Sequence, residues 1–199
     1  MAWVAPITFV AGTPPTAAEV NSMLYTNMLE TMPGLATQRG QFFVTSGVNS
    51  IVARTIGQDN RTSADGPITV TSTSYGNGTG AISHALCTVT VTTGTTALAI
   101  WNSQANISHS TDSNQKGFTS VAITGDTTVA ASDNYAQSIE VDSTEPFGVF
   151  GASMPGSLMA HYFTGLTAGS NTFTLKYRVR VAGEGFDTFY GQSLAVIPF

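Results

Sequence analysis

Residues 171–181, N-T-F-T-L-K-Y-R-V-R-V, constrain the fold more than any other stretch of the chain. Apolar side chains stand at every second position, namely Phe173, Leu175, Tyr177, Val179 and Val181. Successive side chains of a β-strand point to opposite faces, so this strict alternation predicts a strand with one buried face. In a helix the same side chains would be scattered around the whole circumference, so no helix is expected here.

The polar face of this predicted strand carries Lys176, Arg178 and Arg180, three of the protein's seven lysines and arginines. Like charges on one face favour an acidic neighbour, and Glu140 and Asp142 share one face of a second alternating stretch. We predict that the two strands are neighbours, or face each other across a subunit contact, with both acids meeting the basic row. A solvated basic face without a partner is the alternative.

The chain contains few charged residues. They make up 10% of it, against roughly 25% in ordinary soluble domains. An isolated soluble subunit favours a charged surface, so the shortage predicts that other subunits cover much of this one. The formal net charge of −5 disfavours nucleic acid or an anionic membrane as a partner.

Three further signals narrow the class of protein. The single cysteine, Cys87, cannot form an internal disulfide, so a disulfide scaffold is not expected. No basic segment precedes an apolar run at the N-terminus, so no secretory signal is predicted. No apolar run reaches the roughly 18 residues of a membrane span, so no insertion into a membrane is expected.

The N-terminal segment is predicted to dock. Residues 1–14 carry Trp3, Ile7 and Phe9 in an extended, proline-punctuated arm, and a free arm would not hold this apolar density. The arm is therefore expected to bind its own domain or a neighbouring subunit.

A helix is expected to follow this arm. Thr16 and Glu19 have the spacing of a capping box, which predicts a helix from residue 17 to about residue 31. One apolar stripe follows its length, formed by Val20, Met23, Leu24 and Met28. The helix either folds onto its own sandwich or packs against symmetry mates or a docking partner.

The chain as a whole is predicted to be a mainly β protein in three parts. Residues 1–56 would hold the arm, the helix and a β-hairpin built from 41–45 and 50–54, and would serve docking and oligomerisation. Residues 57–66 have almost no apolar content and are predicted to be a linker loop. Residues 67–199 carry eight or more short strands with frequent turn signals, which predicts a jelly-roll-like β-sandwich. Within it, residues 86–91 and 97–101 are expected to form a hairpin, with Gly94 at positive φ.

No sequence motif indicates an enzyme or a cofactor. The chain has no G-x-S-x-G elbow, no phosphate-binding glycine loop and no closely spaced histidine or cysteine pair. Asp59, Asn60 and Asp65 offer oxygens to Ca²⁺, although an ordinary polar loop is favoured because the spacing is not that of an EF-hand. A glycosidase on a sandwich fold stays open as an alternative, and it requires a close pair of carboxylates in a cleft.

Several short motifs resemble a known family. The opening W-V-A-P-I-T-F-V-A-G-T-P-P-T-A-A-E-V-N, followed by L-E-T-M-P-G-L-A-T and G-Q-F-F-V-T-S-G-V-N-S-I-V-A-R, resembles the N-terminal cassette of minor tail proteins from tailed phages of actinobacteria. V-T-V-T-T-G-T-T-A-L, G-L-T-A-G-S-N-T-F-T-L-K-Y-R-V and the ending A-V-I-P-F look like the β-sandwich domain that often follows this cassette. The resemblance covers most of the chain and is weakest at residues 102–117 and 143–160.

This resemblance implies a non-enzymatic structural protein of the virion, assembled in the host cytoplasm. It implies homo-oligomers, most often trimers, that contact other virion proteins on the tail or the head. The first hypothesis is therefore a minor tail protein-like subunit, with a decoration or fibre protein of the head as an alternative. A second hypothesis is a host-glycan-binding module, with loops such as 75–80 and 102–117 carrying the site.

Overall fold

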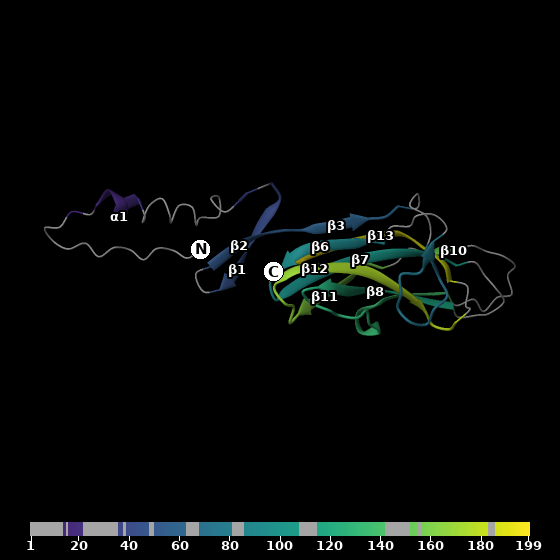
Figure 1. The fold of residues 1–199 in the computed structure, drawn as a ribbon. Helices are drawn as coiled ribbons and strands as arrows, with labels where there is room; N and C mark the ends of the chain where they lie inside the picture. Colours follow the sequence, from purple (N-terminus) through teal and green to yellow (C-terminus); the bar gives the residue numbers. More distant parts are fainter. Residues whose placement is uncertain are drawn as a thin grey trace. The chain divides into compact units, whose positions relative to one another are not determined.

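The computed structural model describes residues 14, 16–21, 36–37, 39–47, 50–62, 68–80, 86–107, 115–141, 152–154, 157–182 and 186–199. The chain divides into two compact units (Figure 1). The first comprises Met1–Thr55 together with Phe199, and the second comprises Ile56–Pro198. The division falls one residue before the end of the predicted docking segment, residues 1–56.

The first unit begins, in its described part, with a capped helix. The Glu19 backbone N–H donates to Thr16 Oγ1 at 3.2 Å, and the Thr16 backbone N–H donates to Glu19 Oε2 at 2.7 Å. This reciprocal pair confirms the predicted capping box, and the hydrogen bonds from Thr16 lower the pKa of the Glu19 carboxyl. Helix α1 is described over Ala17–Asn21, and its predicted continuation to about residue 31 lies outside the described residues.

A two-stranded sheet completes the described part of the first unit. Strands β1 (Gln41–Gly47) and β2 (Ser50–Thr55) pair antiparallel, with Phe43 opposite Ala53 and Val44 opposite Val52. The predicted hairpin is therefore confirmed.

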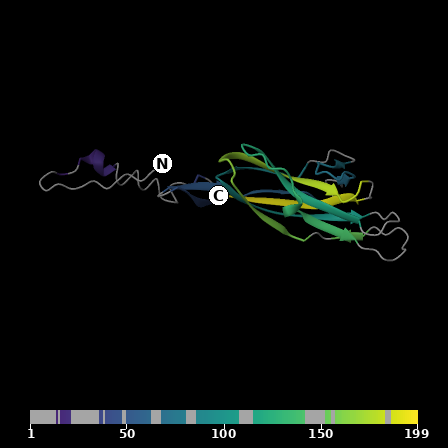
Figure 2. The ribbon, with the colours of Figure 1, turned by 90° about the horizontal axis from the view of Figure 1, so that it is seen from below.

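The second unit is a β-sandwich of two antiparallel sheets whose strands run along the same long direction (Figures 1 and 2). The four-stranded sheet has the order β6 (Thr88–Thr93), β12 (Gly169–Val179), β8 (Gln115–Gly125), β9 (Gln137–Val141). The seven-stranded sheet has the order β10 (Ala152–Met154), β7 (Thr96–Ile107), β13 (Phe186–Pro198), β4 (Ile68–Val70), β5 (Thr79–Gly80). In addition, β11 (Met159–Thr164) pairs with β7, and β3 (Gly57–Asn60) pairs with β13.

The core lies between these two sheets, and the alternating strand supplies its centre. Phe173, Leu175, Tyr177 and Val179 are completely buried on β12, which confirms the predicted face. Val181 departs from the pattern, because β12 ends at Val179 and leaves the Val181 side chain 49% exposed. Ring contacts join the sheets, with centroid distances of 6.0 Å between Phe163 and Phe173 and 5.0 Å between Tyr177 and Phe189.

The predicted linker at residues 57–66 is wrong for its first four residues, which form β3. This strand has no apolar alternation because the polar side chains of Gln58 and Asn60 are exposed. Its inward positions are Asp59, which is polar, and Gly57, where an added Cβ would lie 2.3 Å from Val89 Cγ1. Backbone pairing with β13 therefore makes the strand, and its side chains give no sequence signal.

The predicted hairpin around Gly94 is also wrong. Its two strands belong to different sheets, because β6 pairs with β12 while β7 pairs with β13 and β11. The connection therefore crosses from one layer of the sandwich to the other, and Gly94 is not among the glycines with positive φ. Two apolar runs around a glycine indicate a chain reversal, but they do not indicate which strands pair across it.

Candidate functional site

Most of the predicted docking residues lie outside the described part of the chain. This group comprises Trp3, Ile7, Phe9, Met23, Leu24 and Met28. Val20 is the one member that the structure describes; its side chain is half-buried, and its backbone N–H donates to the Thr16 carbonyl at 3.1 Å. Docking through this segment therefore stays a prediction.

The predicted pairing of the acidic and basic strands is wrong within the sheet. Strand β8 lies between β9 and β12, so Glu140 cannot meet the row of cations on β12 directly. Glu140 instead pairs with its register partner Lys116 on β8, with 3.1 Å between Lys116 Nζ and Glu140 Oε2. Asp142 lies outside the described residues, and the alternative of a subunit contact stays a prediction.

Arg178 pairs with an acid from a 3₁₀ helix rather than from a strand. Its guanidinium donates two hydrogen bonds to Asp133, at 2.9 Å from Nε to Oδ1 and 2.5 Å from Nη2 to Oδ2. The Tyr75 hydroxyl donates to the same carboxylate at 2.7 Å, and the guanidinium lies 3.8 Å from the centre of the Phe118 ring. The hydrogen bonds from Arg178 hold the pKa of Asp133 below its usual range, and burial raises the pKa of Tyr75.

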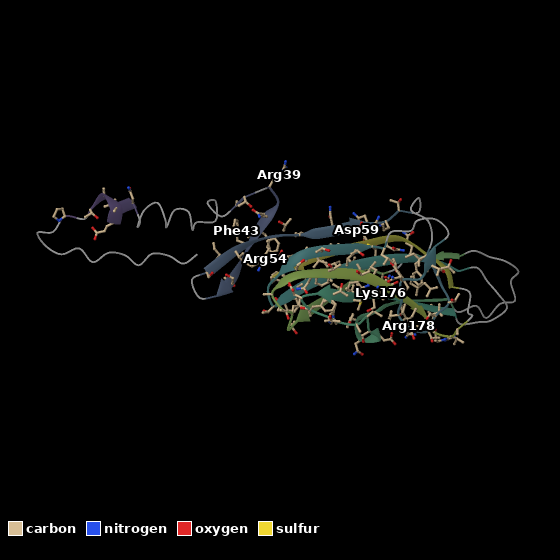
Figure 3. All side chains as sticks on the ribbon, in the orientation of Figure 1. Arg39, Phe43, Arg54, Asp59, Lys176 and Arg178 are labelled. Atoms are coloured by element: carbon tan, nitrogen blue, oxygen red, sulfur yellow. The ribbon has the colours of Figure 1, made fainter. Side chains whose placement is uncertain are left out.

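This Arg178 cluster joins two connections to the outer face of the four-stranded sheet. Figure 3 labels Arg178 together with Lys176, which lies on the same strand. Tyr75 comes from the segment before β5, and Asp133 comes from the 3₁₀ helix that precedes β9. Bidentate arginine–carboxylate pairs fix geometry as well as charge, so the cluster holds both connections in register with β12.

The other two predicted cations on this strand have separate surroundings. The Lys176 ammonium donates to Asn77 Oδ1, and partial burial lowers the pKa of Lys176. The Arg180 side chain is exposed, and its backbone N–H donates to the Lys116 carbonyl at 2.9 Å. The three cations therefore do not act as one basic row.

Parts of the two loops that were predicted to bind glycan belong to strands or pair with a strand. Residues 102–107 are the end of β7, and residues 115–117 are the start of β8, so the predicted loop is shorter than expected. In the other loop, Gly76 forms a β-bridge to Tyr177, with its backbone N–H donating to the Tyr177 carbonyl at 3.0 Å. Both observations leave fewer loop residues that could carry a glycan-binding site.

Asp59, a candidate Ca²⁺ ligand, is instead part of an internal polar cluster at the end of β3. Its Oδ2 accepts hydrogen bonds from Arg61 Nη2 at 2.8 Å and from the Thr88 backbone N–H at 2.9 Å. Asp65 lies outside the described residues. Among the residues that the structure places, no group of three or more histidine, cysteine, aspartate or glutamate side chains is arranged to hold a metal ion.

Cys87 lies beside this cluster and is completely buried, with its Sγ donating to the Asp59 carbonyl at 3.4 Å. Burial raises the pKa of the Cys87 thiol to about 12. At pH 8 only about one thiol in 10⁴ would then be ionised, and the thiolate is the reactive form. The folded environment therefore protects this thiol chemically as well as sterically.

We expect Cys87 in the folded chain to react with an aromatic disulfide reagent at pH 8 at least about a thousandfold more slowly than in guanidinium. The measurement is the rate of thiolate release, followed by absorbance. A Thr90→Cys variant places an exposed thiol on β6 and serves as a fast-reacting control. Rapid reaction of native Cys87 would show that the core around it is open.

A second buried polar network links the two sheets, and sequence reasoning missed it. Gln137 Oε1 on β9 accepts from the Ser103 backbone N–H and from Ser103 Oγ on β7, both at 3.1 Å. Gln137 Nε2 donates to the Ser103 carbonyl at 3.4 Å, and Ser103 Oγ lies 2.7 Å from Thr119 Oγ1 on β8. The available signal was that Gln137 occupies the same face as Ile139, where an apolar residue is the rule.

Comparison of the chain with protein-family models gives no match, and comparison with curated proteins gives none. Within the described residues, no helix is long and apolar enough to cross a membrane. The polar contacts described above hold loops and sheets in place, so their observed role is structural.

Proposed function

We propose that this chain is a homo-oligomeric structural subunit of a tailed-phage virion, similar to a minor tail protein. In this proposal the N-terminal segment attaches the subunit to the particle or joins it to other copies, and the β-sandwich is displayed outward. The motifs that resemble minor tail proteins support the family, and they lie at residues 3–21, 29–37, 40–54, 89–98, 165–179 and 195–199. A decoration protein of the head is the alternative within it.

The division of the chain into two units carries this proposal. The sequence of the N-terminal unit includes the apolar arm, and the described residues of the sandwich include a buried hydrophobic core of their own. An apolar segment of this kind is suited to binding another chain. The low charged fraction of 10% supports the same interpretation, because covered surface needs fewer charges.

The test is size-exclusion chromatography with light scattering on the full chain and on a variant that lacks residues 1–34. We expect the full chain to elute as an oligomer, and we expect the truncated variant to lose copies or lose its attachment to particles. A stable monomer whose mass and binding are unchanged by the truncation would contradict the proposal. A cryo-electron map of the particle would then distinguish tail from head.

A further inference from the structure

We infer that copies of this chain associate through the outward face of the seven-stranded sheet, an inference that rests on the homo-oligomer proposed above. The apolar face of this sheet consists of Leu98, Ile100, Ala160, Tyr162, Ala195 and Ile197. The proposed partner is a second copy of the same chain, meeting the apolar face with its own.

Strand register assembles the apolar face from three neighbouring strands. On β7 the residues at 97, 99 and 101 are completely buried in the core, so Leu98 and Ile100 point outward. Leu98 has Ile197 of β13 and Tyr162 of β11 as its register partners. Ile100 in the same way lies between Ala195 and Ala160, which gives two apolar rows across the sheet.

The apolar face remains partly open to solvent in a single copy. The Tyr162 side chain is 51% exposed, and Leu158, which precedes β11, is 70% exposed. The positions that flank the two rows are uncharged, since Gln58 is paired with Ala195, and Asn102 with Ser193. Within the face, Leu98, Ile100, Ala195 and Ile197 are half-buried. A contiguous apolar surface that is partly exposed marks an interaction site more often than isolated exposed residues do.

The outer face of the four-stranded sheet has the opposite character. It carries the Lys116–Glu140 ion pair and the Arg178–Asp133 ion pair. The two outward faces of one sandwich therefore differ in charge, which is expected if one face is hydrated and the other is covered in the assembly.

Charge distribution favours a second copy as the occupant. A strongly charged partner would find no complementary group on the apolar face, whereas another copy presents the same uncharged surface. The net charge of −5 opposes association in general. Packed sheets lie roughly 10 Å apart, so face-to-face contact would separate the ion pairs of two copies by more than the Debye length of about 8 Å.

The size of the apolar face sets the expected strength of association. Strands about 4.8 Å apart and rows about 7 Å apart, with the polar positions beside them, cover a flat area of roughly 400 Å² per copy. A standard stable interface buries about 800 Å² on each partner. The face alone therefore predicts weak, concentration-dependent association, which a second contact through the N-terminal segment would strengthen.

The experiment compares two variants of the full chain by sedimentation velocity over a range of concentrations. Leu158→Lys with Ala160→Lys adds one charge on the apolar face and one directly beside it. Thr90→Lys with Thr124→Lys adds the same two charges at exposed positions of the four-stranded sheet. We expect the first variant to require at least tenfold higher concentration for association, and we expect the second to behave like the unmodified chain.

Several outcomes would overturn the inference. Unchanged association of the first variant would do so. An equal loss of association in both variants would also do so, because the added charge itself, and not its position, would then be the cause. Association that persists in the first variant while binding to particles is lost would assign the face to another virion protein. A monomeric unmodified chain at every concentration would instead contradict the homo-oligomer proposed above.

Cross-linking gives a second and independent measurement. In the full chain, Ala160→Cys places a thiol on the apolar face, while the native Cys87 is buried and protonated. We expect a short bis-maleimide to join copies of this variant but not copies of the Thr90→Cys control. Equal yields of the linked species from both variants would contradict association through the apolar face.

Discussion

Replacing Gln137 with leucine is expected to lower the free energy of unfolding by about 2–6 kcal/mol. The Gln137 carboxamide binds both the backbone N–H and the carbonyl of Ser103, and both residues are at most 2% exposed. Leucine has similar volume but no polar atoms, so two buried backbone groups would lose their partner. A buried group without a hydrogen bond costs about 1–3 kcal/mol, which gives the range. Chemical denaturation followed by tryptophan fluorescence measures the change.

Two further variants test this explanation. Gln58→Leu makes the same chemical change at an exposed position of β3, so we expect a change within about 0.5 kcal/mol. Gln137→Glu keeps the shape but adds a buried carboxyl, whose pKa should rise above the unfolded value of about 4.3. The folded state then holds its proton more tightly, so stability is greatest below that pH and falls as pH rises toward the folded pKa. Equal losses in Gln137→Leu and Gln58→Leu would show that the inter-sheet network is unimportant.

Gly125→Ala is expected to destabilise the sandwich by about 3–5 kcal/mol, the other large effect. Gly125 ends β8 with a φ of +112°, a conformation that side chains disfavour. A Cβ at this position would lie 2.3 Å from the Ser170 carbonyl oxygen, which is backbone and cannot rotate away. The Asp126 backbone N–H donates to the same carbonyl at 3.1 Å, so any shift would also break the turn that follows.

Two other glycines separate the causes of this loss. Gly165 has a φ of +71° and open space around a built Cβ, so Gly165→Ala should cost only about 1 kcal/mol of backbone strain. Gly76 has open space and an ordinary φ, so Gly76→Ala should be nearly neutral, within about 0.5 kcal/mol. Thermal unfolding of the three variants gives the comparison. Similar melting temperatures for Gly125→Ala and Gly76→Ala would contradict the steric explanation.

The fold class was predictable because the strongest patterns are local. Alternation on β12 identified the core face at Phe173, Leu175 and Tyr177, since a strand divides its side chains between two faces whatever its neighbours are. The capping box at Thr16 and Glu19 was predictable for the same reason, because both partners lie within one turn.

The candidate contacts were much less predictable, because they depend on which strands become neighbours. Matching opposite charges between strands predicted Glu140 as a partner of the β12 cations. Strand β8 lies between them, and its Lys116 forms the ion pair with Glu140 instead. Arg178 pairs with Asp133, which is 45 residues away in the chain, and no local sequence pattern indicates a contact between residues so far apart. Gln137 was missed because a single polar residue at an inward position resembles an irregularity of the pattern.

Sequence alone determined that this chain is mainly β and that a capped helix begins at residue 17. These properties follow from side-chain periodicity and from hydrogen bonds within a few residues. Only the tertiary structure decided that β3 is a strand, that β6 and β7 belong to different sheets, and that Leu98, Ile100 and Tyr162 share one outward face. Pairing between distant strands is the reason, because register joins residues that share no pattern along the chain.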